Sequence, residues 1–403
     1  MTVAARLRRK NADLDIVMVE PAETHYYQPL LTLVGGALAT LEETERPEKG
    51  LIPDGVHWVK ERVSSFAPEV NSLTTESGKR IDYDVLVVAP GLALAPEEVE
   101  GLGPALESDP RVWTNYDPRF VTKGRAAIDS FRGGHAVFTT PDSPLKCGGG
   151  PQKIMWIVEE WLRKNGVRDG ARVTLTVPGD QIFGVPKYRR TLERLASQRG
   201  VELLTHVHLV EVRPERSEAV FENLETREEV VVAYDLLHVT PPQRSPEFTR
   251  QSPLAGAGAD PDENDQSPAV RDRGLLRGAR GGFVDVDRET LQHKRFPNVW
   301  SLGDAAALPT AKTGAAVRKQ APVVVENLLA VAAGGAPTAK YDGYTSCPLV
   351  VGHDRVVLAE FGYDGSILET FPVDQAKPRY SAWLLKRHLL PLIYWHGMLR
   401  GRM

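Results

Sequence analysis

The sequence predicts an α/β fold with two Rossmann-like domains, each built in three layers, and a C-terminal amphipathic segment. Three observations carry this prediction. An apolar strand signature that begins Tyr-Asp and ends in a turn occurs at 83–91 and again at 234–242. A glycine-rich turn at 144–156 joins an apolar strand to a helix, as in a β-α-β unit. A third apolar strand ends at Gly303 and Asp304. The 403 residues allow two or three domains, and 42% hydrophobic content is that of a folded globular protein.

The N-terminal part reads as a helix at 1–10 followed by a strand at 14–19 that ends in Glu20. In a dinucleotide-binding fold, an acidic residue at the end of the second strand binds ribose hydroxyls, so Glu20 is a candidate ligand. The first strand and the G-x-G-x-x-G loop of such a unit are missing from the sequence. We therefore expect the chain to open inside the first helix, through either a misplaced start or a fragment.

Polar and aromatic residues at 24–28, which include Gln28, follow Glu20 and either line a cofactor or pack in the core. Alternating runs at 56–63 and 72–75 predict strands. The signature at 83–91, which ends in Gly91, is similar to that of two-dinucleotide-domain flavoproteins. In those proteins this turn runs close to FAD.

Cys147 follows an apolar strand and precedes a helix, within the turn Lys-Cys-Gly-Gly-Gly-Pro. The aligned dipoles of a helix N-terminus favour an anion, and Lys146 and Lys153 add positive charge nearby. A merely buried cysteine would have apolar neighbours instead. The pattern therefore predicts a reactive thiolate. The same turn lacks the glycine spacing of an NAD(P) loop.

Cys347 is the second of two cysteines and lies 200 positions after Cys147. Its polar, turn-forming flank at 341–349 argues against a buried structural cysteine. Two cysteines make neither a disulfide scaffold nor a zinc site, and a redox pair is plausible where they meet in space. Three histidines have no ligand-like spacing, so no metal site is expected: His206, His208 and His238.

The segment 255–282 is rich in Gly, Asp, Pro and Arg and predicts a flexible loop. The strand that ends in Gly303 and Asp304 is typical of the last part of an FAD-binding fold, where the aspartate binds a ribityl hydroxyl. Lys312 follows, beside a helix of small residues. A lysine there stabilises the negative charge of reduced flavin, and a solvated side chain is the alternative.

The C-terminal segment from Tyr380 alternates Trp, Leu and Tyr with Lys, Arg and His. It is too short and too charged to span a bilayer, and predicts a pair of amphipathic helices in a membrane interface. An ordinary packed or dimer-forming helix is the alternative. The net charge of -4 gives no sign of nucleic-acid binding, and the N-terminus lacks the apolar core of a signal peptide.

Together these segments resemble the sulfide:quinone oxidoreductases, in particular the type shared by mitochondria and some bacteria. The resemblance rests on six stretches: 144–155, 219–224, 238–242, 308–313, 341–349 and 368–375. It implies FAD/NAD(P)-type domains with FAD as cofactor. It also implies oxidation of hydrogen sulfide with reduction of ubiquinone or menaquinone by a peripheral (monotopic) membrane enzyme. That enzyme would lie on the cytoplasmic face in a bacterium and on the mitochondrial inner membrane in a eukaryote.

The resemblance makes Cys147 and Cys347 the redox pair, bridged at rest through a disulfide or trisulfide. Sulfide would attack at Cys347 and leave a persulfide, and the released Cys147 thiolate would attack the flavin. A small nucleophile, namely glutathione, coenzyme A or sulfite, would then remove the sulfane sulfur. The implied cofactor-binding residues are Glu20, Gln28, Val63, Gly91, Gly303, Asp304 and Lys312.

The expected organisation interleaves these units along the chain. FAD-binding parts are expected at 1–108 and 283–340, a second Rossmann-like domain at 109–254, the loop at 255–282 and a C-terminal domain at 341–403. Three alternatives stay open: a type II NADH:quinone oxidoreductase, a sulfide dehydrogenase that reduces a cytochrome, and a truncated protein without flavin or enzymatic activity. A homo-oligomer is also left open.

Overall fold

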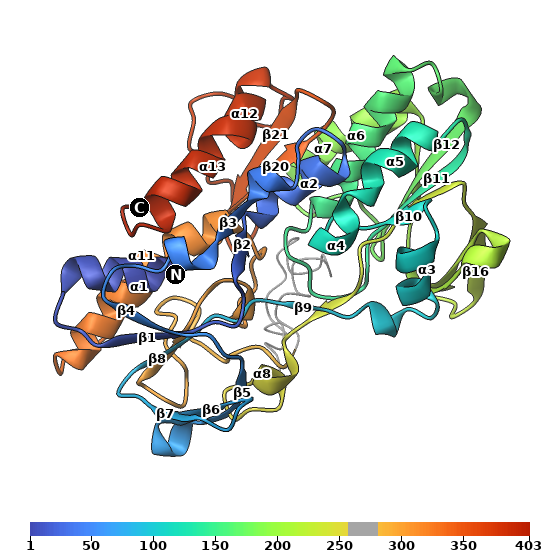
Figure 1. Ribbon diagram of the computed structural model, residues 1–403. Coiled ribbons are helices and arrows are strands. Elements are labelled where there is room, and N and C mark those ends of the chain that lie inside the picture. Colours follow the sequence, from blue (N-terminus) through green and yellow to red (C-terminus); the bar gives the residue numbers. More distant parts are fainter. Residues whose placement is uncertain (257–280) are drawn as a thin grey trace.

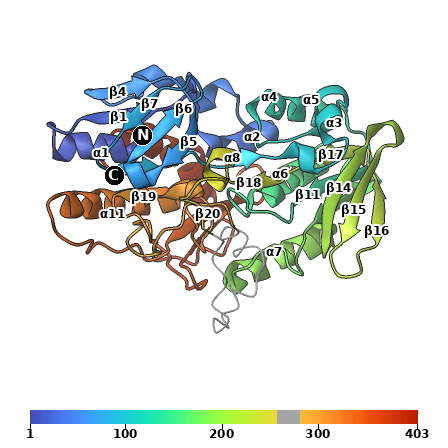
Figure 2. The same cartoon turned by 90° about the horizontal axis from the view of Figure 1, so that it is seen from below.

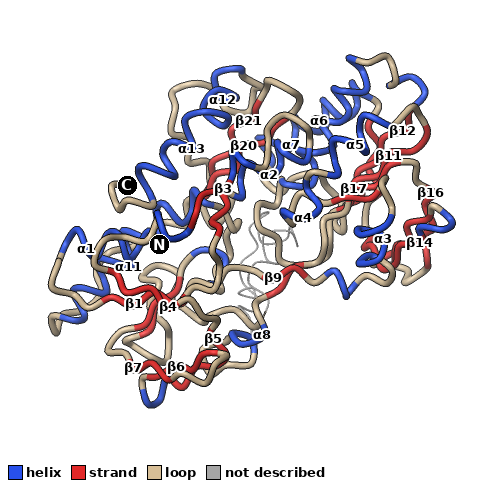
Figure 3. Tube along the Cα trace, in the orientation of Figure 1, coloured by secondary structure: helices blue, strands red, loops and turns tan. Residues whose placement is uncertain are grey.

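The computed structural model describes residues 1–256 and 281–403 (Figure 1). The loop predicted at 255–282 therefore lies, apart from its first and last residues, outside the described residues. Figure 1 shows the two termini close together, with the C-terminal helical segment above them. Figure 3 shows the strands gathered into several separate sheets.

A five-stranded parallel sheet forms the centre of the second Rossmann-like unit and confirms the predicted β-α-β pattern. Its strands follow the spatial order β10 (Val112–Trp113), β17 (Leu236–His238), β11 (Gly134–Thr139), β12 (Ala171–Thr176) and β13 (Val201–Leu204). The signature at 234–242 supplies β17, which lies between β10 and β11.

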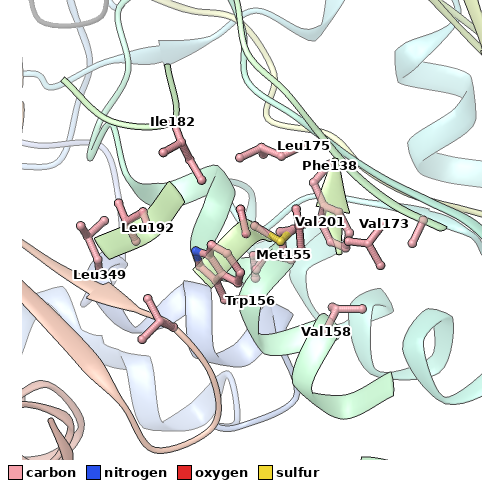
Figure 4. Close-up of a cluster of buried hydrophobic side chains, with 14 of the residues drawn as sticks. Phe138, Met155, Trp156, Val158, Val173, Leu175, Ile182, Leu192, Val201 and Leu349 are labelled. Carbon is pink, nitrogen blue, oxygen red and sulfur yellow. The ribbon is translucent and has the colours of Figure 1, made fainter. Parts of the chain in front are cut away.

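This unit has three layers. Helices α6 (Gly150–Lys164) and α7 (Pro186–Arg199) cover one face of the sheet. An antiparallel sheet covers the other: β14 (Val207–Arg213), β15 (Glu218–Asn223) and β16 (Glu229–Ala233). Side chains along β11 alternate between the two layers, because Phe138 packs with α6 whereas Val137 packs with Phe221 of β15. Figure 2 shows the antiparallel sheet at the edge of the molecule, and Figure 4 shows Met155 and Trp156 of α6 between Phe138 and Leu349.

The other unit contains two parallel strand pairs. One joins β1 (Ile16–Val19) to β4 (Val56–Val59), and the other joins β8 (Leu86–Val88) to β19 (Val299–Ser301). Helices α1 (Thr2–Lys10) and α11 (Gly314–Ala332) lie side by side in the same core (Figure 1). The run at 56–63 was predicted as a single strand. Instead it is divided between β4 and β5 (Val63–Ala67), and β5 pairs with the antiparallel strands β6 (Ser72–Thr75) and β7 (Arg80–Asp82).

Two short strands connect the units. β9 (Ala93–Leu94) follows the first signature and β18 (Gln243–Arg244) follows the second, and the two pair antiparallel. The repeated sequence signature therefore marks the two places where the chain leaves a sheet and crosses between units. The remaining short elements are β2 (Thr24–Tyr26), β3 (Glu45–Pro47), α2 (Leu31–Gly35), α3 (Leu102–Ser108), α4 (Pro118–Val121), α5 (Lys123–Ser130) and α8 (Glu247–Arg250).

The C-terminal part begins with the antiparallel pair β20 (Thr345–Val350) and β21 (Val356–Phe361). The predicted pair of helices is wrong, since one helical segment runs from Tyr380 to Met398. It comprises α12 (Tyr380–Leu384), a π-helical turn, α13 (Leu390–Leu392) and a second π-helical turn. The first π-helical turn lies just before Pro391, which has no backbone N–H to donate. The wider turn accommodates the proline, and the helical segment continues through it. Among the described residues, no helix has the length and apolar character needed to cross a membrane.

Candidate active site at a cysteine pair

Cys147 lies immediately before the N-terminus of α6, as predicted. Its φ of +57° is the left-handed conformation, and its carbonyl oxygen accepts a hydrogen bond of 2.7 Å from the Gly150 N–H. Its own N–H donates to the Lys312 carbonyl oxygen at 2.9 Å. This second bond fixes Cys147 against the segment that follows Gly303 and Asp304. The strained turn therefore holds the sulfur at the junction between the two units.

Cys347 faces Cys147, although its surroundings differ from the prediction. It lies inside β20 and is 2% exposed, so the prediction that its polar, turn-forming flank argues against burial is wrong. Pairing with β21 explains this, because Ala359 lies opposite Cys347 and both belong to the same core. The two Sγ atoms are 3.2 Å apart, longer than a disulfide bond, so no disulfide joins the two cysteines in this structure.

The two cysteines differ in pKa, because of a buried lysine and the hydrogen bond between the two sulfur atoms. Lys153, which is 3% exposed, places its Nζ 2.9 Å from the Sγ of Cys147. The hydrogen bond from Cys347 and the charge of Lys153 hold the pKa of Cys147 well below that of an ordinary thiol, against the effect of burial. The same hydrogen bond, together with burial, raises the pKa of Cys347. Cys147 is therefore the thiolate of the pair, and Cys347 is the protonated thiol.

Lys386 is a second buried lysine, which the sequence analysis counted among the interfacial cations. It is 2% exposed, and its Nζ donates to the Pro29 carbonyl oxygen at 2.6 Å. Burial, followed by repulsion from Lys153, lowers the pKa of Lys386 to about 7, and the nearby cysteines partly oppose this shift. The amine therefore changes charge near neutral pH, and it lies close enough to the cysteine pair for its charge to affect their pKa values. Spacing along the chain gave no sign of it, since 239 positions separate it from Cys147.

The glycine triplet is packed tightly against Cys347. A β-carbon on Gly149 would lie 2.9 Å from the Sγ of Cys347 and would clash with Leu349. A β-carbon on Gly148 would meet no atom within 4 Å. Close approach to β20 therefore requires glycine at 149 and does not require it at 148.

A substitution at Gly149 should separate the two sulfur atoms. We expect Gly149→Ala to slow disulfide formation between Cys147 and Cys347 by about tenfold or more, because Cys347 must move away from the new methyl group. Mild oxidation of the reduced protein followed by thiol titration measures this, since the chain has no other cysteine. Gly148→Ala is the matched control and should oxidise at the wild-type rate. Equal rates for both variants would contradict the packing described.

Three of the predicted cofactor-binding residues lie next to Cys147. Gly303 has a φ of +68°, and its N–H donates to Gln320 at 2.7 Å. Burial raises the pKa of the Asp304 carboxyl group. The Nζ of Lys312 donates to the carbonyl oxygens of Asp304 at 2.9 Å and Ala306 at 3.0 Å. Burial also lowers the pKa of Lys312 to about 8.

The other predicted residues lie at the edges of the first unit. Glu20 follows β1, where its N–H donates to Val59 at 3.0 Å, and Val63 begins β5. Both therefore lie beyond the carboxyl ends of the β1–β4 pair. Gly91 has a φ of +77° and open space around its α-carbon. Gln28 accepts a hydrogen bond of 2.8 Å from Lys146, the residue before Cys147, so this side chain reaches the cysteine turn.

A pocket that is open to solvent reaches Cys347 from the side of the parallel sheet. It lies at the carboxyl ends of β11 and β12, where Thr140, Val177 and Gly179 line it, and Lys312 lines its inner end. The buried sulfur thus has a route to small molecules.

No cluster of three metal-ligating side chains occurs in 1–256 or 281–403. His238 is fully buried, and burial lowers its pKa to about 3.

The fold and the paired cysteines define the class first: an oxidoreductase of the two-dinucleotide-domain flavoprotein type. No family model matches the sequence. The mitochondrial sulfide:quinone oxidoreductase of Mus musculus is 41% identical over 402 residues, which cover 100% of this chain and 84% of the mouse protein. The Dictyostelium discoideum enzyme of the same name is 42% identical over 404 residues, with the same coverage. The chain therefore belongs to the sulfide:quinone oxidoreductase family.

Solved structures agree on the fold. The sulfide:quinone oxidoreductase of Aquifex aeolicus superposes with a TM-score of 0.77 at 18% identity, covering 100% of this chain and 89% of that one. NDH2 from Plasmodium falciparum gives a TM-score of 0.53 at 12% identity and covers 76% of this chain and 62% of its own. The architecture predicted from sequence is confirmed, and the NDH2-like alternative is the more distant of the two.

Proposed function

We propose that this protein oxidises hydrogen sulfide at Cys147 and Cys347 and passes two electrons through FAD to a membrane quinone. The observation that carries the proposal is the asymmetric cysteine pair, whose sulfur atoms are 3.2 Å apart and in which the Nζ of Lys153 lies 2.9 Å from the Sγ of Cys147. A thiolate with a low pKa is a good leaving group when a disulfide is attacked. The family membership supports the same reaction.

The residues present fit FAD at both ends of the cofactor. Glu20 lies beyond the end of β1, where its carboxylate would bind a ribose hydroxyl, and Val63 begins β5, which follows β4. The ribityl chain of FAD would bind at a polar site formed by Gly303, Asp304 and the helix that begins at Gly314. When bound, the flavin supplies a two-electron acceptor beside Cys147.

Each of the two cysteines, together with Lys153 and Lys386, would have a separate role in the reaction. In the oxidised state a disulfide, or one additional sulfur, joins Cys147 to Cys347. Lys386 in its neutral form takes a proton from hydrogen sulfide, and the hydrosulfide attacks the Sγ of Cys347. The sulfur–sulfur bond breaks, its electron pair stays on Cys147 as a thiolate beside Lys153, and Cys347 keeps the new sulfur as a persulfide.

The open pocket would admit the acceptor for that sulfur. Cys347 is buried, so the pocket at the ends of β11 and β12 is its route to glutathione, coenzyme A or sulfite. Attack of this nucleophile on the outer persulfide sulfur returns Cys347 to a thiolate. Closure of a sulfur bridge between Cys147 and Cys347, either after the outer sulfur has left or with that sulfur kept in the bridge, would release two electrons that FAD, when bound, would accept. One sulfide is thereby oxidised for each quinone reduced.

The C-terminal helical segment would hold the enzyme on a membrane surface. Its apolar side chains Leu384, Leu389 and Leu392 are 41%, 49% and 55% exposed. His388, which is exposed and lies between them in sequence, suits anionic headgroups when protonated, whereas Arg387 pairs with Glu43 at 2.7 Å. Trp383 and Trp395 of the segment would not contribute to this surface, because they are buried in the same core as Leu30 and Tyr27. The mitochondrial names of the relatives support a mitochondrial-type membrane.

Charged substitutions on this segment should release the protein from membranes. We expect Leu389→Glu with Leu392→Glu to weaken binding to anionic phospholipid vesicles by about tenfold or more, because two exposed apolar side chains are lost and two negative charges are added. Vesicle co-sedimentation measures the change. The matched control is Val70→Glu with Val231→Glu, which alters two valines that are 60% and 48% exposed on other elements. Equal release by both pairs would contradict a specific surface.

Substrate choice tests the proposed reaction directly. The purified protein, supplied with FAD and a soluble quinone analogue, should reduce the quinone with sulfide and fail to do so with NADH. Addition of sulfite, glutathione or coenzyme A in separate assays then identifies the acceptor by the rise in rate. Reduction with NADH and none with sulfide would reject the proposal in favour of the NADH:quinone alternative.

A further inference from the structure

Tyr116 is a buried tyrosine beside the cysteine pair that the proposed reaction leaves without a role. It follows β10 and is 6% exposed. Its hydroxyl has no hydrogen-bond partner in the protein. The hydroxyl of Thr240 is close enough to influence it, yet neither hydroxyl has a partner in bonding geometry. An unsatisfied buried hydroxyl is costly, so its retention calls for a ligand or a function.

The glycine triplet locates this hydroxyl at the reacting sulfurs. A β-carbon on Gly149 would press on the Sγ of Cys347, and one on Gly150 would clash with the hydroxyl of Tyr116. The Tyr116 hydroxyl and the Cys347 sulfur therefore touch adjacent residues of the same turn, directly after Cys147. Burial raises the pKa of Tyr116 well above the ordinary value, and the charges of Cys147 and Cys347 raise it further. The group is consequently a permanent donor near both sulfurs.

We infer that the Tyr116 hydroxyl donates a hydrogen bond to the sulfur anion that enters the cysteine pair, and that it is a substrate-binding residue for hydrosulfide. The inference rests on the proposed function. An anion that approaches Cys347 loses its hydration, and a neutral donor compensates for part of that loss without adding a charge. The two lysines have other partners, since Lys153 contacts Cys147 and Lys386 donates to Pro29. Of Tyr116, Lys153 and Lys386, only Tyr116 has a donor without a partner in the described part of the chain.

Tyr116→Phe should affect flavin reduction by sulfide and leave flavin re-oxidation by quinone unchanged. In anaerobic stopped-flow experiments on the flavin-loaded protein, we expect about tenfold slower flavin reduction at low sulfide concentration and an unchanged limiting rate of re-oxidation by quinone. The melting temperature should equal or exceed that of the wild type, because an unpartnered hydroxyl is removed. Tyr234→Phe is the matched control. Its ring is also buried in the second unit, but its hydroxyl is already bonded to Asp109 at 3.1 Å, so it should leave sulfide reduction unchanged and lower the melting temperature.

Two outcomes would overturn the inference. Flavin reduction at the wild-type rate in Tyr116→Phe would show that the hydroxyl does not meet the sulfide. An equal slowing of reduction and quinone re-oxidation would assign the hydroxyl to the flavin or to the structure instead. The wild-type protein tests the proposed function separately from the role of Tyr116. If sulfide does not reduce the flavin of the wild type, the proposed function is rejected, whatever the result for Tyr116→Phe.

Discussion

Cys147→Ser and Cys347→Ser are each expected to reduce sulfide-dependent quinone reduction by about a thousandfold or more, the scale seen when a nucleophile is removed from a catalytic unit. A serine hydroxyl neither ionises near neutral pH nor forms a bond equivalent to a disulfide, so neither variant can open or close the sulfur bridge. Steady-state assays with sulfide and a soluble quinone analogue measure the loss.

The two variants should also share a spectroscopic signature. Sulfide should no longer bleach the flavin absorption, whereas chemical reduction of the flavin and its re-oxidation by quinone should stay intact. The double variant should be no worse than either single one, because the two sulfurs act as a unit. More than a tenth of the wild-type rate in either single variant would contradict the proposed chemistry.

Lys153→Gln should give the second largest loss, and the loss should depend on pH. The ammonium of Lys153 holds the pKa of Cys147 below that of an ordinary thiol, so its removal raises that pKa. At pH 7 a smaller fraction of Cys147 is then ionised, and the thiolate leaves less readily. We expect about a hundredfold lower rate at pH 7. The deficit should shrink as the pH rises toward 9, where the thiol ionises without help.

Lys164→Gln on the same helix is the control for Lys153. Its ammonium pairs with Glu160 at 2.9 Å, and its side chain is 54% exposed, so it changes the charge of α6 without touching the cysteines. Its pH–rate profile should match that of the wild type. A Lys153→Gln deficit that is constant across this pH range would show that the lysine acts through packing and not through the thiolate.

Local signals in the sequence were enough to predict the Cys147 turn. A strand, three glycines and a helix fix where that residue lies, because all of the determinants are within 20 residues of it. The repeated Tyr-Asp signature predicted two related units for the same reason, and β8 and β17 confirm it. Glu20 and Gly303 also follow strands at the expected edges.

Features that depend on long-range packing escaped the sequence analysis. Cys347 has a polar flank, but its pairing with β21 buries it. Lys386 was grouped with surface cations because its neighbours in sequence are basic, and only the tertiary fold directs it toward Pro29 and the cysteines. Tyr116 carries no motif at all. Its importance depends on an unpartnered hydroxyl and a glycine in a different element.

The most direct test of the central claim is an anaerobic absorption spectrum of the purified chain, recorded before and after sulfide and again after a soluble quinone. The account predicts a flavin spectrum that bleaches with sulfide in the wild type, recovers with quinone and fails to bleach in Cys147→Ser. A flavin that sulfide bleaches equally well in Cys147→Ser, or a protein that binds no flavin when FAD is supplied, would contradict it.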